Sequence, residues 1–240
     1  MLNEDVLKEF IFECEMRRLS KRTIQSYRNA NLRMMKYLEQ EFHITELEQT
    51  HHLAIRAYVQ YQTAQGLAET YINRNMIAYR CYFNYCIKEN YITNNPMDRI
   101  SKQKEPIVMI ETFNDDEVKR LIGVFKGPRF LDVRNQLLMV MFFDTGMRNS
   151  EMCDLKIEDL RDTYIRVMGK GKKMRYLPIT PFINKYLIRY LRVRESYIKD
   201  KLCYQTEYLF LSQKGKRLTP EAMEHILKKA GEKAIVRSHI

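Results

Sequence analysis

The spacing of apolar residues changes along this chain from the period of an α-helix to that of a β-strand, and this change limits the folds open to it. Over the first hundred residues, apolar side chains recur three or four positions apart, which places them on one face of a helix. After Leu160 they alternate at every second position over residues 164–167 and 174–179, as in strands. We therefore predict a mainly α fold with a small β-sheet, in the α+β class.

Four helices are expected before residue 98, forming a compact bundle. Ser20 is the expected N-cap of the second helix and Thr50 that of the third, which Gly66 closes. The sequence Asn94-Asn95-Pro96 ends the fourth helix. The residues expected to face the core are Leu7, Phe10 or Ile11, Cys14, Ile24, Tyr27, Met34, Leu38, Leu53, Ala57, Tyr58, Tyr61, Ile72, Met76, Tyr79, Phe83 and Cys86.

A charged segment without periodicity separates this bundle from a second unit. Residues 101–106 read SKQKEP, so we predict a first domain over 1–98, a linker over 99–112 and a second domain over 113–240. The second domain begins with the acidic sequence NDDE at 114–117, which suits a helix start. Further helices are expected over 133–143, 181–197 and 220–230, with a short strand over 208–211.

Basic residues outnumber acidic ones, at 41 Lys and Arg against 30 Asp and Glu, for a net charge of +11. Cations that neutralise phosphates release bound counterions, so this excess favours a polyanion such as nucleic acid. A membrane surface is the other polyanion, but no apolar run approaches the ~20 residues of a bilayer span. The opening residues MLNED do not resemble a signal peptide. We therefore expect a cytoplasmic protein without a membrane segment.

The cysteines and histidines favour neither a disulfide framework nor a metal site. The cysteines are odd in number and form no CxxC pair, and adjacent His51 and His52 point to different faces of a helix. Reduced thiols and no metal are therefore expected. The cysteines are Cys14, Cys81, Cys86, Cys153 and Cys203.

One stretch of the second domain carries positive charge only. Between Thr163 and Arg194 there is no Asp or Glu, and the strands near 164–179 lie within this stretch. Such a run is often a solvated face, but its single sign and the expected hairpin favour contact with phosphates. Its cations are Arg166, Lys170, Lys172, Lys173, Arg175, Lys185, Arg189, Arg192 and Arg194.

Residues 145–151, TGMRNSE, contain the strongest candidate for chemistry. Gly146 permits the left-handed turn that ends one helix, and Arg148 stands just before the next. A guanidinium fixed there can present two parallel donors to a phosphate, and Glu151, about one helical turn on, can hold it. On spacing alone, an ordinary helical corner with a surface arginine remains the alternative.

Two boxes, in the correct order and at the correct spacing, resemble the tyrosine recombinase (phage integrase) family. The segment TGMRNSE, followed by Leu155 and Asp159, resembles the first arginine box of that family. Residues 165–179, IRVMGKGKKMRYLPI, resemble its three-stranded sheet, with Lys170 at the catalytic lysine of the turn. Residues 19–27, LSKRTIQSY, and 92–96, ITNNP, resemble its SAM-like core-binding bundle. The resemblance covers essentially the whole chain.

This resemblance implies site-specific breakage and rejoining of DNA in a mobile element, without metal or cofactor. A tyrosine attacks the phosphate, while Arg148 stabilises the transition state, Lys170 protonates the leaving oxygen and Glu151 gives support. The implied partners are double-stranded DNA and other recombinase protomers. The candidate DNA-binding residues are Lys21, Arg22, Arg28, Arg33, Arg74, Arg80, Lys172, Lys173 and Arg175.

The family pattern continues with a His-x-x-Arg box, a His or Trp, and the nucleophilic Tyr, which these residues do not show. We align RSHI at 237–240 just upstream of that box, so His239 is not expected to be catalytic. The resemblance thus implies an incomplete, C-terminally truncated catalytic domain that binds DNA without forming a phosphotyrosyl bond, with residues after about Leu218 frayed. The alternatives are a non-catalytic DNA-binding regulator or decoy at a recombination site, and a basic helical protein without a DNA role.

Overall fold

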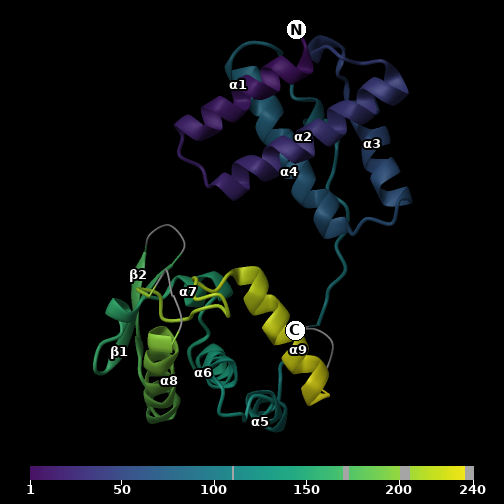
Figure 1. The fold of residues 1–240 in the computed structure, drawn as a ribbon. Coiled ribbons are helices and arrows are strands. Elements are labelled where there is room, and N and C mark those ends of the chain that lie inside the picture. The colour runs from purple at the N-terminus through teal and green to yellow at the C-terminus, as the bar shows by residue number, and fades with distance from the viewer. Residues whose placement is uncertain (110, 170–172, 201–205, 236–240) are drawn as a thin grey trace. The chain divides into compact units, whose positions relative to one another are not determined.

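The computed structural model describes residues 1–109, 111–169, 173–200 and 206–235, and these residues are mostly helical (Figure 1). The chain divides into two compact units, Met1–Met109 and Ile110–Ile240, each with its own hydrophobic core. Among the described helices, none combines the length and the apolar character that a membrane span requires.

The first unit is a helical bundle in which α4 packs against the other three α-helices. Tyr79, Tyr82 and Phe83 of α4 are fully buried and fill the centre. Ser20 caps α2 as predicted, because its Oγ accepts a hydrogen bond from Thr23 N at 3.1 Å. The elements are α1 (Asn3–Met16), α2 (Lys21–Phe42), η1 (Leu47–Gln49), α3 (His52–Ala64), α4 (Glu69–Lys88) and η2 (Pro96–Arg99).

The third helix differs from the prediction in its cap and in its buried face. His51 caps α3 through Nδ1, which accepts from Ala54 N at 3.3 Å, so the expectation of Thr50 was wrong. The buried face carries Ala54, Ile55, Tyr58, Val59 and Gln62, whereas the predicted core residues Leu53 and Tyr61 are exposed. An apolar side chain at helical spacing can lie on either of two neighbouring faces, and packing against α2 and α4 decides between them.

The start of the predicted linker is attached to the bundle. Asn73 Nδ2 donates to the Gln103 carbonyl and to Glu105 Oε1, both at 2.8 Å, and Gln103 N donates to Asn73 Oδ1 at 2.9 Å. Met97 and Ile100 are buried in the bundle core. The segment leaves the bundle surface only after Glu105.

The second unit combines packed helices with a two-stranded antiparallel sheet. Helices α6 and α8 make its largest interface, and Leu138, Tyr190 and Phe210 lie in its core. Asn114 caps α5 in a capping box with Glu117, which explains the acidic helix start. The elements are α5 (Asp115–Gly123), α6 (Phe130–Thr145), α7 (Asn149–Asp154), η3 (Ile157–Asp159), β1 (Tyr164–Met168), β2 (Met174–Pro178), α8 (Pro181–Asp200) and α9 (Pro220–Ala234).

The described residues form a two-stranded sheet rather than the expected three-stranded one. Strands β1 and β2 pair as predicted, with Ile165 opposite Leu177 and Val167 opposite Arg175. Isolated bridges, such as Leu160 with Ile165, stand where a third strand would extend the sheet. The predicted strand over 208–211 likewise contributes only single bridges at its two ends.

Helix α9 is regular where fraying was expected. The Thr219 hydroxyl caps it by accepting from Ala222 N at 3.2 Å, and Pro220 stands in its first turn. Met223 and Ala230 are fully buried, and the helix packs against α5 and α7. A cap and a buried face are what hold a helix of this length in place.

Candidate functional site

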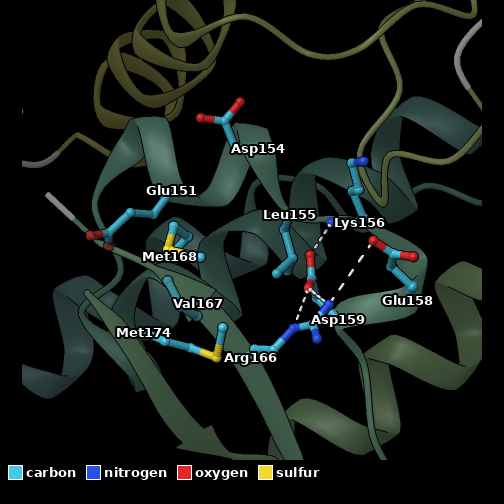
Figure 2. A pocket seen from close by; sticks show the side chains of 10 residues that line it. All are labelled: Glu151, Asp154, Leu155, Lys156, Glu158, Asp159, Arg166, Val167, Met168 and Met174. Atoms are coloured by element: carbon cyan, nitrogen blue, oxygen red, sulfur yellow. Dashed lines mark hydrogen bonds and ion pairs between the residues drawn. The ribbon is translucent and has the colours of Figure 1, made fainter. Parts of the chain in front are cut away.

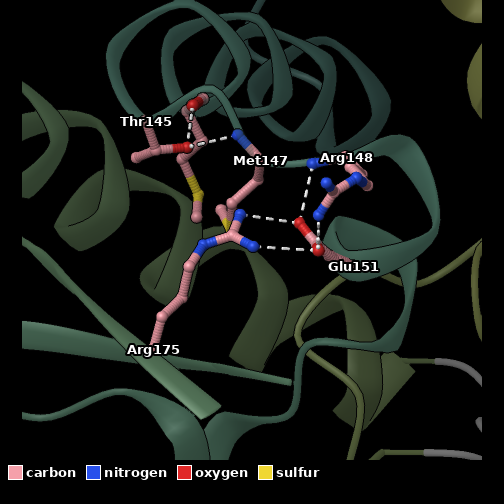
Figure 3. Close-up of polar contacts among 6 residues, drawn as sticks. Thr145, Met147, Arg148, Glu151 and Arg175 are labelled. Carbon is pink, nitrogen blue, oxygen red and sulfur yellow. Dashed lines mark hydrogen bonds and ion pairs between the residues drawn. The ribbon is translucent and has the colours of Figure 1, made fainter. Parts of the chain in front are cut away.

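A tightly turned corner between α6 and α7 carries Arg148. Gly146 ends α6 in the left-handed conformation at a φ of 61°, as predicted. Thr145 Oγ1 donates to the Met141 carbonyl at 2.5 Å and accepts from Met147 N at 3.2 Å (Figure 3). Because the Met147 side chain is buried as well, the backbone that leads into Arg148 is fixed.

Glu151 binds both the backbone and the side chain of Arg148 (Figure 3). Its Oε2 accepts from Arg148 N at 2.9 Å, and its Oε1 accepts from Arg148 Nη1 at 2.8 Å. Arg175 of β2 approaches the same carboxylate with Nη1 at 3.0 Å from Oε1 and Nη2 at 2.8 Å from Oε2. Two guanidinium groups therefore share one carboxylate, which leaves the cluster with a net positive charge.

The Glu151 carboxylate is charged at neutral pH although its side chain is only 5% exposed. Burial raises its pKa, but the hydrogen bonds from Arg175 and Arg148 outweigh burial and lower the pKa to about 2. The Arg148 side chain, by contrast, is 65% exposed. Its donors that do not bind Glu151 are therefore available to an anion.

The two ends of the β1–β2 turn lie beside this carboxylate. Gly169 N donates to the Lys173 carbonyl at 2.8 Å, which closes the base of the turn. A Cβ atom placed on Gly169 would lie 3.6 Å from Glu151 Oε1. Lys170 and Lys172, the predicted lysines of the turn, lie outside the described residues, whereas Lys173 is exposed.

The predicted cations of the first unit differ in their surroundings. Lys21, Arg22 and Arg28 are exposed on α2. Arg33 of α2 and Arg74 of α4 are exposed and lie 6.0 and 5.4 Å from the ring centroid of Tyr71.

Arg80 is different from these cations. Its Nη2 donates to the Ile100 carbonyl at 2.6 Å, and the residue is half-buried. This contact fixes the end of η2 against α4, so Arg80 has a structural role in the bundle.

The positive stretch between Thr163 and Arg194 does not form a single cationic face. Arg166 Nη2 lies 2.8 Å from Asp159 Oδ1, and Arg189 Nη1 donates to Gln136 Oε1 at 3.1 Å. Arg194 is buried and donates to backbone carbonyls that include Leu209 O at 3.1 Å. Several of these cations therefore hold the fold together, because a carboxylate, a side-chain amide or backbone carbonyls bind them within the second unit.

A basic turn that we did not select from the sequence adjoins α7. Arg217 Nη2 lies 2.7 Å from Asp154 Oδ1, and its Nε donates to the Cys153 carbonyl at 3.2 Å. The turn reads KGKR over 214–217, with Gly215 at a φ of 68°. A glycine surrounded by cations is the signal that would have found it, since it repeats the pattern of the β1–β2 turn.

A hollow of about 370 Å³ lies next to Glu151, between α7, η3 and β1 (Figure 2). Its lining includes the carboxylates of Asp154, Glu158 and Asp159, of which Asp159 binds Arg166 (Figure 2). These carboxylates disfavour a phosphate, so the exposed side of Arg148 is the better anion site. Within the described ranges, no group of three or more His, Cys, Asp or Glu side chains is placed to hold a metal ion.

Comparison with known proteins identifies the family. Residues 111–240 match the phage integrase family, and residues 8–90 match the phage integrase N-terminal SAM-like domain. The chain belongs to the phage integrase family of tyrosine recombinases.

The relatives that the chain resembles include bacterial recombinases. It is 28% identical over 215 residues to the tyrosine recombinase XerC of Thermodesulfovibrio yellowstonii, covering 88% of this chain and 69% of the relative. It is 30% identical over 222 residues to XerC of Bacillus pumilus, covering 91% and 72%.

Solved structures have the same fold. A lambda integrase dimer bound to a COC′ core site matches with a TM-score of 0.76 at 17% identity, covering 99% of this chain and 83% of that one. The XerH site-specific recombinase bound to palindromic difH matches with a TM-score of 0.73 at 25% identity, covering 91% and 64%. The expected SAM-like bundle and recombinase fold are thereby confirmed.

Proposed function

We propose that the chain binds double-stranded DNA as a site-specific tyrosine recombinase and holds a backbone phosphate at Arg148. The observation that carries this proposal is an exposed guanidinium whose backbone and side chain are both fixed by the buried Glu151 carboxylate. A cation held in place before its ligand arrives loses little entropy on binding, and a guanidinium matches the geometry of a phosphate.

The roles of the site follow from the charge that develops on a phosphate under attack. Arg148 stabilises the additional negative charge on the phosphate oxygens, and Glu151 keeps Arg148 in place. In the complete cleavage reaction of the family, Lys170 would protonate the oxygen that leaves. The described ends of the turn that contains Lys170 lie beside Glu151, which supports this assignment.

The first unit contributes contacts to the DNA backbone in this proposal. Exposed Lys21, Arg22 and Arg28 and the Arg33–Tyr71–Arg74 group are its candidates, and Lys173 is the described exposed cation of the β1–β2 turn. One lambda integrase structure is bound to DNA and another is a dimer bound to a COC′ core site, which supports DNA and further protomers as partners.

The second part of the proposal concerns the activity of these 240 residues by themselves. They contain no His-x-x-Arg sequence, so we expect this polypeptide to bind DNA without forming a phosphotyrosyl bond. This is also the behaviour of the alternative, a DNA-binding regulator that occupies a recombination site.

A nicked suicide substrate, in which the cleaved strand cannot be rejoined, tests both parts. DNA binding that weakens steeply with salt and gives no covalent adduct in denaturing gels is the expected result. A covalent adduct would refute the second part, that no phosphotyrosyl bond forms, and would leave the DNA-binding proposal unchanged. Binding that is weak and independent of salt would refute the proposal itself.

A further inference from the structure

Arg175 occupies a strand position that faces the protein core. It pairs with Val167 across the sheet, and directly opposite residues of an antiparallel pair project from the same face. Val167 is buried, and the next pair on that face joins Leu177 to the buried Ile165. The register of the hairpin therefore directs Arg175 inward, toward α7.

The Arg175 guanidinium meets Glu151 in a two-pronged contact. Nη1 lies 3.0 Å from Oε1 and Nη2 lies 2.8 Å from Oε2, which is the parallel geometry of a strong charge-assisted pair (Figure 3). The side chain and backbone of Arg148 each bind one of the same oxygens. A carboxylate offers about four acceptor positions, so Arg148 and Arg175 together satisfy it.

The two arginines differ in their exposure and in the hydrogen-bond donors that remain available to a ligand. The Arg148 side chain is 65% exposed, whereas that of Arg175 is 36% exposed and uses both of its terminal nitrogens on Glu151. We infer that Arg175 is a positioning residue that fixes Glu151, and through it Arg148, and that it does not itself contact a phosphate. This inference rests on the proposed phosphate site at Arg148, and it replaces the assignment of Arg175 as a DNA contact.

Replacement of Arg175 by Lys separates the two roles. A lysine keeps the positive charge and can contact a phosphate as a point charge, but it cannot supply two parallel donors to Glu151. A direct phosphate contact therefore tolerates Arg175→Lys, and a positioning role does not.

The test measures the affinity of the full chain for a fluorescein-labelled DNA duplex by anisotropy, at one low salt concentration. The variants are Arg148→Ala, Arg175→Lys and the double substitution, with Arg120→Lys on the exposed surface of α5 as the matched control. We expect each single substitution to weaken binding about tenfold or more, as for a lost hydrogen bond to a charged group. The double variant should bind no more weakly than Arg148→Ala, and the control should bind like the parent.

Two results would overturn the inference in distinguishable ways. If Arg175→Lys binds like the parent, or if it weakens binding further in the Arg148→Ala background, Arg175 acts independently of Arg148 and the positioning role alone fails. If Arg148→Ala binds like the parent, both the proposed phosphate site and the positioning role of Arg175 are refuted. Circular dichroism monitors the folding of every variant. If Arg175→Lys is unstable, Arg175→Gln takes its place, because it also removes the paired donors, and it should weaken binding in the same way.

Discussion

Glu151 is a carboxylate whose two arginine partners stand in different environments. Burying an ion is expensive unless its hydrogen-bonding capacity is satisfied, and here Arg148 and Arg175 satisfy it. One partner comes from the same helical corner and the other from a strand distant in sequence. The same interaction thus attaches α7 to the sheet and orients the exposed Arg148.

Substitution of the two arginines should affect stability unequally. Arg148→Ala leaves Glu151 with the paired donors of Arg175 and should cost about 0–1 kcal/mol, as for exposed ion pairs. Arg175→Ala leaves a buried carboxylate short of two donors and should cost about 1.5–3 kcal/mol. Denaturant unfolding of both variants measures the difference, and a larger loss for Arg148→Ala would make Arg148 the structural residue.

The contribution of Glu151 to stability should depend on pH. Its pKa is lowered from 4.5 to about 2 in the folded chain, so the stabilisation is fully present above pH 4.5 and is lost as the pH falls toward 2. The difference in unfolding free energy between the parent and Glu151→Gln should therefore shrink between about pH 5 and pH 3.

Glu39→Gln, on the exposed surface of α2, is the matched control, because it removes one carboxylate that lies outside the arginine cluster. A difference for Glu151→Gln that stays constant over the same pH range would show that the carboxylate is not held by its arginines.

At the scale of the elements, the sequence predicted the helix cap, the helix end and the strand pair, which depend on local side-chain and backbone chemistry. Ser20 and Gly146 hold the positions that their side-chain chemistry and backbone freedom allow, and the strand pair follows from alternation. The buried face of α3 and the partner of Arg175 were not predictable, because both depend on which elements pack together. Helical spacing placed Leu53 in the core, and the surrounding charge did not indicate that Arg175 binds Glu151.

A side chain at Gly169 should crowd the backbone of the β1–β2 turn. A Cβ atom there would lie 3.3 Å from the Lys173 carbonyl oxygen and 3.5 Å from Arg175 Nη1. Gly169→Ala should therefore destabilise the second unit by about 1–3 kcal/mol, as crowding in a packed site does. Its unfolding free energy and its DNA affinity should fall together.

Gly123→Ala provides the control for this crowding. Its Cβ would meet only the end of the flexible Lys126 side chain, at 3.3 Å, so the variant should be as stable as the parent or slightly more stable. Equal stability of the Gly169→Ala and Gly123→Ala variants would contradict the crowding of Gly169 by the Lys173 backbone.

On the scale of the whole molecule, the chain consists of two units with separate cores, joined by a segment whose early part is bound to α4. Ile107 and Val108 are 96% and 74% exposed. Limited digestion with elastase, which cuts after small apolar residues, should therefore cleave first near these residues and release two folded fragments. Ile107→Asp should slow this cleavage, whereas first cleavage inside α4 would contradict the division.

The distribution of charge over the whole molecule was predicted only in part. The excess of cations was visible in the sequence, but the fold pairs Arg166 with Asp159 and buries Arg194, so the positive run is not one surface. Sequence order cannot show which carboxylates will neutralise which cations.

The most direct test of the phosphate site is the salt dependence of DNA affinity, compared between the parent and Arg148→Ala. Loss of one phosphate contact should reduce the slope of log affinity against log salt by about 0.9 and weaken binding to all duplexes alike. Arg120→Ala, on the exposed surface of α5, should leave the slope unchanged. A slope for Arg148→Ala equal to that of the parent would contradict the binding of a DNA phosphate by Arg148.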